Sequence, residues 1–183
     1  KAYTECNIAL TSPYSASGRN PYDMRAKCEV KPLCYNFTKV DVFFNREDVR
    51  AALGVGDRKW SSCNMQVNQM FGGDWMKNYQ TDLPDQLESG IKVLIYAGDQ
   101  DYICNWLGNK AWTLAMDWSG HDAFNAAEDL PYRLDSNSLE VGKLRTAKGF
   151  SFLQLYSAGH MVPLDQPEAA LDMFNGFVLG SKF

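Results

Sequence analysis

The stretch "KVLIYAGDQDYICNWLGN" at residues 92–109 decides the fold class. Its first part, "KVLIYAG", is a short, continuous run of apolar and β-branched residues that ends at a glycine. This pattern is typical of a strand buried on both faces of a parallel sheet. Residues 105–118 then predict a helix, "FSFLQLYSAG" at 150–159 a second strand, and "PEAALDMFNGFVLG" at 167–180 a final helix. The order strand, helix, strand, helix indicates an α/β fold.

The final helix carries the clearest periodicity in the chain. Pro167 stands at its start, where a proline suits the first helical turn. Its apolar positions follow the i, i+3, i+4, i+7, i+8 spacing of one helix face. These positions are Ala170, Met173, Phe174, Phe177 and Val178. We therefore expect this face to pack on the sheet.

Upstream of residue 90 the patterns are weaker. Residues 1–40 are rich in Ser, Pro, Tyr, Asn and Gly without periodicity, which predicts irregular structure tied by a disulfide. "NREDVRAALGV" at 45–55 predicts a short helix with Asn45 as its N-cap, ended by Gly54. A further helix is expected through 81–89, ending at Gly90. Residues 119–148 are polar and predict a loop or a hairpin.

The composition excludes several classes of protein. The 183 residues include 45% hydrophobic and 13% aromatic residues, which argues against disorder, and the net charge of −4 comes without a basic cluster. No apolar run approaches the ~20 residues of a membrane span. Nucleic acid and membranes are therefore not expected partners. "KAYTECNIAL" at the start has neither an initiator Met nor a signal-peptide core, so we expect Lys1 to follow a processing cut or a fragment boundary.

The five cysteines suggest disulfides rather than a metal centre. No two of them have the C-x-x-C spacing, and only two histidines are present, so no metal site is expected. Cys28 and Cys34 flank a short loop that a local disulfide could close. "NFT" at 36–38 makes Asn36 a candidate glycosylation site. Together these features favour an oxidising compartment of the secretory route.

The residues with candidate chemistry follow the two strands. Asp99 and Asp101 come directly after the first strand, and His160 follows the second. In open α/β sheets functional groups gather beyond the carboxyl ends of strands, and the order Asp then His matches the last two members of an α/β-hydrolase triad. The alternative is that the acids are turn formers and His160 a hydrogen-bonded loop histidine. The other histidine, His121, is interpreted as a solvated loop residue without a role.

Several long motifs in order resemble the C-terminal part of a serine carboxypeptidase, of the carboxypeptidase Y and cathepsin A types. They are "RNPYDMRAKCE" (19–29), "SSCNMQVN" (61–68), "GDWMKNY" (73–79), "VLIYAGDQDYICNWLGNKAW" (93–112) and "GHMVPLDQPEAAL" (159–171). The resemblance implies the C-terminal part of an α/β-hydrolase fold, preceded by a disulfide-tied insertion or cap segment. Residues 1–90 would form the cap segment with its connecting helices, and residues 91–183 the core.

The resemblance also implies roles for single residues. Asp101 would be the catalytic aspartate, Asp99 a structural acid and His160 the catalytic base. The pocket for the departing C-terminal residue would be lined by Tyr22, Tyr35, Ser62, Cys63 and Met161. The pocket for the residue before it would be lined by Asn7, Trp75, Ile103 and Cys104. The alternatives are core aromatics for Trp75 and the tyrosines, a gap filler for Met161 and an inert buried thiol for Cys104.

By the same resemblance, Cys28 pairs with Cys34, and Cys104 stays free beside the site. Cys6 and Cys63 would pair with cysteines of an N-terminal chain or segment of the same enzyme. That segment would also bring the nucleophile, because no serine of this chain lies in G-x-S-x-G. We therefore expect the isolated chain to be inactive.

The function implied is release of single residues from peptide C-termini at acidic pH, without metal or organic cofactor, in a lysosome or vacuole or after secretion. One alternative is a carboxypeptidase-like acyltransferase or hydroxynitrile lyase on the same scaffold. Another is a non-catalytic protective or binding subunit in which the Asp–His pair is incidental.

Overall fold

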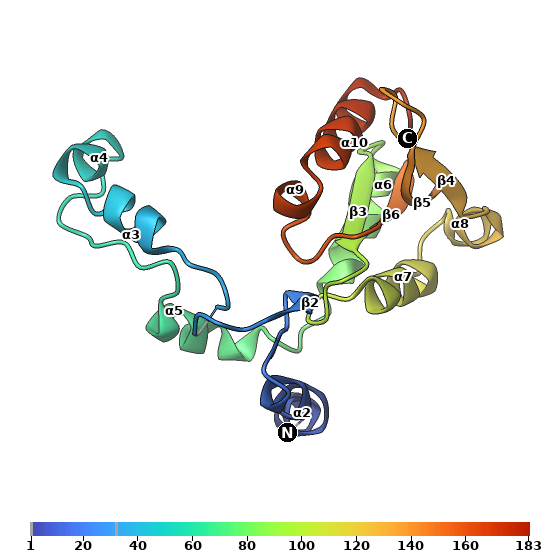
Figure 1. Cartoon of the computed structure of the whole chain (residues 1–183). Helices are drawn as coiled ribbons and strands as arrows, with labels where there is room; N and C mark the ends of the chain where they lie inside the picture. Colours follow the sequence, from blue (N-terminus) through green and yellow to red (C-terminus); the bar gives the residue numbers. More distant parts are fainter. Residues whose placement is uncertain (1, 32) are drawn as a thin grey trace. The chain divides into compact units, whose positions relative to one another are not determined.

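The computed structural model describes residues 2–31 and 33–183, so Lys1 at the start and Pro32 in the cysteine loop lie outside it. The chain forms two compact units (Figure 1). The first comprises Lys1–Pro13 and Lys27–Lys77, and the second comprises Tyr14–Ala26 and Asn78–Phe183. The sequence led us to expect one boundary at residue 90. In the structure, residues 14–26 and 78–90 belong to the same compact unit as the C-terminal part.

A four-stranded mixed sheet with the order β3-β6-β5-β4 forms the centre of the second unit. The two predicted strands are β3 (Val93–Gly98) and β6 (Phe150–Leu155), which pair in parallel. β5 (Glu140–Ala147) runs antiparallel to β6, and β4 (Leu130–Arg133) runs antiparallel to β5. The hairpin that was one of two predictions for residues 119–148 is thus confirmed.

Side chains of β6 alternate between two cores, as the period of two requires. Phe150 and Phe152 pack in one cluster with residues of α6 (Leu83–Glu88), α7 (Trp106–Ala115) and α8 (His121–Ala126). Leu153 and Leu155 pack in the other with residues of α9 (Val162–Asp165) and α10 (Pro167–Leu179). Figure 1 shows α9 and α10 on one side of the sheet and α7 and α8 on the other. The sheet is therefore covered on both faces, the arrangement of an α/β fold.

The expectation for β3 is wrong in one respect. It is an edge strand of this sheet rather than a strand buried on both faces, and Tyr96 remains 44% exposed. Within the described part of the chain, β3 pairs only with β6. The other described elements of this chain therefore leave part of the apolar surface of β3 exposed.

The helix predicted at the C-terminus is confirmed as α10, but its buried face differs from the predicted one. Ala170 and Met173 are buried as expected, whereas Phe174 and Val178 are 61% and 62% exposed. The buried strip instead uses small residues, Ala169, Ala170 and Gly176, beside Met173. Small side chains let the helix approach the sheet closely, which turns the larger ones outward.

Other elements of the second unit follow the sequence closely. η3 (Tyr79–Asp82) leads into α6, and the chain turns at Gly90 with a φ of +80°, as predicted. His121 departs from the prediction because it is the first residue of α8 rather than part of a loop. It is partly exposed, and its Nδ1 lies within hydrogen-bond distance of Oδ1 of Asp122, at 2.9 Å.

The prediction of irregular structure over residues 1–40 is wrong for most of that range. α1 (Ala2–Cys6), η1 (Asn7–Thr11) and α2 (Ser12–Ala16) form a helical run, followed by β1 (Arg19–Asn20) and β2 (Asp23–Lys27). α3 (Thr38–Phe44) begins before residue 40. The helical run buries no residue. Because it has no buried apolar face, its sequence lacks the hydrophobic periodicity from which a helix is predicted.

α4 (Glu47–Ala52) confirms the helix predicted after Asn45, and Gly54 ends it with a φ of +65°. Asn45 is not its N-cap, however, since Arg46 occupies that position. The Asn45 amide instead donates to the carbonyl of Trp60 at 3.0 Å and accepts from the Trp60 N–H at 3.0 Å. α5 (Met65–Met70) and η2 (Phe71–Gly73) complete the first unit.

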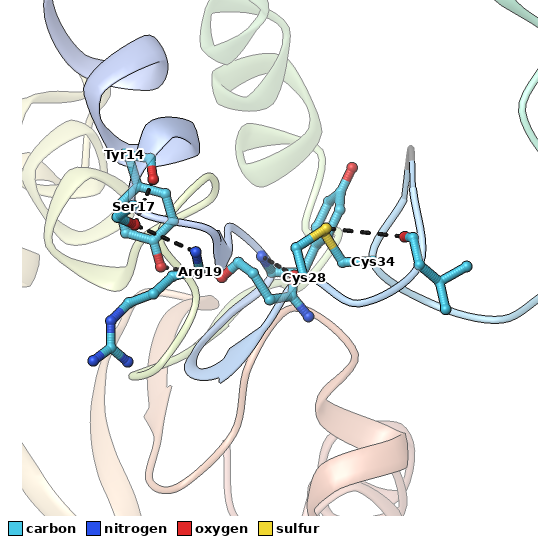
Figure 2. Close-up of a disulfide and its surroundings, with 8 residues drawn as sticks. Tyr14, Ser17, Arg19, Cys28 and Cys34 are labelled. Atoms are coloured by element: carbon cyan, nitrogen blue, oxygen red, sulfur yellow. Dashed lines mark hydrogen bonds between the residues drawn. A yellow bond between two sulfur atoms is a disulfide. The ribbon is translucent and has the colours of Figure 1, made fainter.

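The disulfide between Cys28 and Cys34 is confirmed, with their Cα atoms 4.6 Å apart (Figure 2). Cys6, Cys63 and Cys104 form no disulfide within the part of the chain described. None of the helices in that part has the length and apolarity that crossing a membrane requires.

Candidate active site

Asp101 and His160 lie on the loops that leave β3 and β6. Since these strands are parallel neighbours, their carboxyl ends meet at the same edge of the sheet. His160 Nδ1 lies 2.8 Å from Asp101 Oδ2. Asp101 is 3% exposed, whereas the His160 side chain is 42% exposed. The structure thus joins a buried carboxylate to an imidazole that reaches solvent.

The hydrogen bonds of Asp101 fix the orientation of the imidazole. Its Oδ1 accepts from the backbone N–H of Cys104 at 3.1 Å, so both carboxylate oxygens are engaged. A carboxylate can only accept, so Nδ1 of His160 is the nitrogen that carries the proton. In the neutral ring, Nε2 is then the acceptor that is left for a substrate or nucleophile.

The two acids of "GDQD" take different places. The Asp99 carboxylate accepts from the side chain of Gln100 at 3.0 Å, and the Asp99 N–H donates to the carbonyl of Leu155 at 2.9 Å. These bonds extend the pairing of β3 with β6 by one residue. Of the two acids, Asp101 is the one bonded to His160.

Two glycines allow the loops to approach each other. A Cβ atom at Gly98 would lie 2.2 Å from the carbonyl oxygen of Ala158, and one at Gly159 would lie 2.3 Å from that of Tyr22. Both distances are too short for any side chain. Glycine is therefore required at both positions to bring Asp101 and His160 together.

Residues 20–25 belong to this site, and sequence reasoning assigned only Tyr22 among them. The carbonyl of Pro21 accepts from the N–H groups of Tyr102 and Ile103, each at 3.1 Å. The carbonyl of Tyr22 accepts from the His160 N–H at 2.8 Å. The dipeptide Asn20-Pro21 is a sequence signal for a turn in this segment. In the structure the side-chain oxygen of the buried Asn20 accepts from the Tyr22 N–H at 2.9 Å, which forms an Asx turn.

The expected pocket residues divide between the two units. Tyr22, Ile103, Cys104 and Met161 lie in the second unit, and the Tyr22 ring is 5.2 Å from that of His160. Ile103 is exposed and Met161 precedes α9. Cys104 is exposed, but partial removal of its thiol from water raises the pKa of that thiol, and the charge of Asp101 raises it further. Cys104 is therefore a protonated thiol at neutral pH.

In the first unit, Tyr35, Ser62 and Cys63 line one cavity of about 240 Å³. Asp41, which sequence reasoning missed, lies in its wall and accepts from the Ser62 hydroxyl at 2.6 Å. Asn36 also lines this cavity, and its exposed side chain accepts from the Thr38 N–H at 3.0 Å.

The remaining expected pocket residues, Asn7 and Trp75, also lie in the first unit. Trp75 is 49% exposed and its ring contacts that of Tyr3 at 5.5 Å between centroids. Trp75 is therefore not buried within this chain.

One set of donor atoms in the described residues is close enough to suggest a metal ion. Atoms of Asp101, Cys104 and His160 lie within 4.8 Å of one another. The Asp101–His160 hydrogen bond already uses one carboxylate oxygen and Nδ1. The raised pKa of the Cys104 thiol disfavours the thiolate, which is the form that binds metals. The geometry thus fits proton transfer through the imidazole better than metal binding.

Known proteins with similar sequences are carboxypeptidases. Carboxypeptidase Y homolog A from Emericella nidulans is 48% identical over 185 residues, a match that covers 97% of this chain and 33% of the relative. Carboxypeptidase Y from Candida albicans is 46% identical over 178 residues, covering 96% and 32%. The chain thus spans about a third of the length of the curated relatives it matches.

A solved structure supports the fold. Kex1Δp, a prohormone-processing carboxypeptidase from Saccharomyces cerevisiae, superposes with a TM-score of 0.71 at 24% identity, over 88% of this chain and 36% of that one. This likeness confirms the predicted α/β-hydrolase fold class, of which the chain forms a part. The model of the family described as "Serine carboxypeptidase" matches residues 1–180. With 44–48% identity to its curated relatives besides, the chain belongs to the serine carboxypeptidase family.

Proposed function

We propose that the chain is the C-terminal part of an enzyme that removes single residues from the C-termini of peptides. The observation that carries the proposal is the hydrogen bond of 2.8 Å between the buried Asp101 and the solvent-accessible His160. Membership of the serine carboxypeptidase family supplies the reaction class. Asp101 and His160 are the catalytic residues that this chain contributes.

The proposed reaction is acyl transfer to a serine outside this chain. His160 accepts the hydroxyl proton at Nε2 while the serine oxygen forms a bond to the scissile carbonyl carbon. The same nitrogen then passes the proton to the departing amine as the C–N bond breaks. Water repeats the sequence on the acyl-enzyme and releases the shortened peptide. Asp101 holds Nδ1–H and stabilises the imidazolium in both halves.

The serine and the oxyanion hole are proposed to come from an N-terminal chain or segment of the same enzyme. Relatives three times as long as this chain support that view. The unpaired edge of β3 offers backbone groups to a further strand. Cys6 and Cys63, which form no disulfide here, are the proposed links to that segment.

Each unit contains proposed substrate-binding residues. In the first unit they are Asn7, Tyr35, Ser62, Cys63 and Trp75, of which Tyr35, Ser62 and Cys63 line one cavity. In the second unit they are Tyr22, Ile103, Cys104 and Met161. The aromatic and aliphatic side chains among them favour peptides with apolar residues near the cut.

We also propose an oxidising compartment of the secretory route, ending in a vacuole or lysosome or outside the cell. The disulfide between Cys28 and Cys34 supports it. The exposed Asn36 in its sequon is the proposed glycan site. We also propose that the peptidase activity of the complete enzyme is highest at acidic pH.

The test uses the full-length enzyme with a blocked dipeptide as substrate. His160→Ala is expected to lower kcat by on the order of 10⁴-fold or more, because the base is lost. The matched control is His121→Ala, which removes the other histidine, at the start of α8, and should leave kcat unchanged. Equal activity of the two variants would overturn the proposed role of His160.

The same assay separates this function from its alternatives. Hydrolysis of the dipeptide supports a peptidase, whereas ester-to-alcohol transfer or cyanohydrin cleavage without hydrolysis would indicate an acyltransferase or a lyase. A biological function that survives His160→Ala in the absence of any turnover would indicate a non-catalytic subunit.

A further inference from the structure

Residues 20–25, here called the clamp segment, contact both loops of the Asp–His pair. On the side of Asp101, the Met24 N–H donates to the carbonyl of Gln100 at 2.9 Å. The Pro21 carbonyl accepts from Tyr102 and Ile103. The residues directly before and after Asp101 are thus bound to the clamp segment.

On the side of His160, the same segment holds the backbone of the histidine itself. The His160 N–H donates to the Tyr22 carbonyl at 2.8 Å, and the Tyr22 carbonyl is the atom that a side chain at Gly159 would strike. The clamp segment therefore lies against both loops, although it is about 80 residues from one and 140 from the other in sequence.

Arg25 extends this contact to both ends of residues 157–165, here called the histidine loop, a segment that comprises the loop around His160 and the short helix α9. Its Nη1 donates to the carbonyl of Ser157 at 2.8 Å. Its Nη2 lies 3.4 Å from Oδ2 of Asp165, and that oxygen also accepts from the Gly159 N–H at 2.6 Å. One guanidinium thus reaches the residues that enter and leave the loop around His160.

The guanidinium is itself held in one orientation. Nε and Nη2 of Arg25 donate to the two oxygens of Asp23 at 2.9 and 2.7 Å, a two-point pairing that lysine cannot reproduce. The hydrogen bond from Arg25 lowers the pKa of Asp23, so that the pair stays charged in mildly acidic solution.

The loop needs such support because Ser157 has a φ of +54°. A non-glycine residue in this region is strained and persists only where its surroundings hold it. The Ser157 carbonyl accepts from Arg25 and from the Gln166 side chain at 3.1 Å. Arg25 thus bonds directly to the strained residue of the loop.

We infer that Arg25 is a positioning residue that fixes His160 on Asp101 by tying the histidine loop to the clamp segment. It touches neither of the reacting groups. Its side chain is 43% exposed, so the ion pair itself adds little to folding stability. Arg25 instead acts on the position of the His160 imidazole, and a displacement of a catalytic group by ~1 Å can lower the rate of the reaction by ~10²-fold. The effect on rate rests on the proposed function, whereas the effect on the His160–Asp101 bond does not.

The experiment compares Arg25→Met with Arg19→Met in the full-length enzyme. Arg19 is a matched control because its guanidinium donates to the Met24 carbonyl at 2.7 Å in the same hairpin. Within the described residues Arg19 forms no hydrogen bond or ion pair with the Asp101 loop or the histidine loop. Three quantities are measured: kcat and KM, the thermal midpoint, and the low-field proton resonance of the imidazole Nδ1–H, assigned by its absence in His160→Ala.

In Arg25→Met we expect the low-field resonance to broaden or vanish. We expect kcat to fall on the order of tenfold or more, while KM changes by less than about twofold. The kcat of Arg25→Lys should lie between that of Arg25→Met and that of the wild type. Arg19→Met should retain the low-field resonance and the wild-type kcat. The thermal midpoints of Arg25→Met and Arg19→Met should be similar.

A resonance that is unchanged in Arg25→Met would overturn the inference, as would losses equal to those of Arg19→Met. If the full-length enzyme proves to have no peptidase activity, the proposed function fails and the resonance still decides the role of Arg25. Failure of the two ideas is therefore distinguishable.

Discussion

Asp99 and Asp101 show how a difference of two positions in a turn separates a structural acid from a candidate catalytic one. Both follow β3 and both are aspartates, but only Asp101 lies where its carboxylate meets His160. Asp99 continues the pairing of the strands through its backbone N–H. The distinction depends on which direction each side chain takes after the strand ends.

Asp101→Asn in the full-length enzyme is predicted to lower kcat by roughly 10⁴-fold. The amide of Asn can donate to Nδ1, which favours the tautomer with the proton on Nε2 and removes the acceptor that the reaction needs. Steady-state kinetics with the blocked dipeptide measure the loss. Asp99→Asn is the control and should lose far less; comparable losses in the two variants would contradict the assignment.

Cys104 is predicted to be a slow nucleophile. Burial is the larger cause of its raised pKa and the negative charge of Asp101 the smaller one. Alkylation of Cys104 by iodoacetamide should therefore require a higher pH than alkylation of an ordinary thiol. Asp101→Asn should speed alkylation at a given pH, as followed by mass spectrometry of the peptide that contains Cys104. A rate that is unchanged in Asp101→Asn would show that the charge of Asp101 does not act on the thiol.

At the scale of elements, an ion cluster ties the helices of one sheet face to the sheet. Asp129 pairs with Lys110 of α7 and with Arg145 of β5, the latter at 2.8 Å. Arg145 also donates to the carbonyls of Phe124 and Asn125 at the end of α8. α7 and β5 thus meet at one carboxylate, and Arg145 also binds the end of α8.

This cluster predicts a dependence of stability on pH. Burial raises the pKa of Asp129, but hydrogen bonds from Arg145 and Lys110 outweigh burial and leave it below its usual range. The unfolded chain then binds the proton more readily than the folded one. The stabilisation is therefore fully present above the ordinary carboxyl pKa of about 3.9 and is lost as pH falls through the lower folded value.

The measurement is the thermal midpoint of wild type minus that of Asp129→Asn, at several pH values. The difference should be constant above about pH 5 and shrink towards pH 2. Asp57→Asn is a control at an exposed carboxylate for which the described residues provide no ion pair. A difference for Asp129→Asn that does not change with pH would contradict the prediction.

At the scale of the whole molecule, much apolar surface has no cover in this chain. Phe174 and Val178 of α10 point to solvent, and no residue of α1 to α5 is buried. A protein that spans a third of its relatives' length is expected to leave such surface for the remaining two thirds.

Disulfide mapping tests that view. In the natively purified, non-reduced enzyme, Cys6 and Cys63 should each be linked to a cysteine outside residues 1–183, and Cys104 should be a free thiol. Intact mass before and after reduction then shows whether the partner is a separate chain, since reduction would release a species near 20.6 kDa plus any glycan. A disulfide between Cys6 and Cys63, or free thiols at both, would contradict the proposed linkage.

Sequence patterns predicted the second unit well and the first unit poorly. β3, β6, α6, α7 and α10 bury apolar side chains against a sheet, and this burial imposes the periods that the patterns detect. α1 and α2 bury none, so they were invisible. Asn45 was misassigned because its amide serves a loop 15 residues away, at Trp60, instead of the next helix.

The sequence alone determined the α/β class, the placement of Asp101 and His160 after two apolar strands, and the likeness to the serine carboxypeptidases. These depend on local period and on order along the chain. The likeness also favoured Asp101 over Asp99, and the tertiary structure places the Asp101 carboxylate 2.8 Å from Nδ1 of His160. Only the tertiary structure decided that Arg25 bonds to the histidine loop. It also decided which face of α10 is buried. Such features depend on contacts between segments far apart in sequence, and no local pattern encodes a distance across the fold.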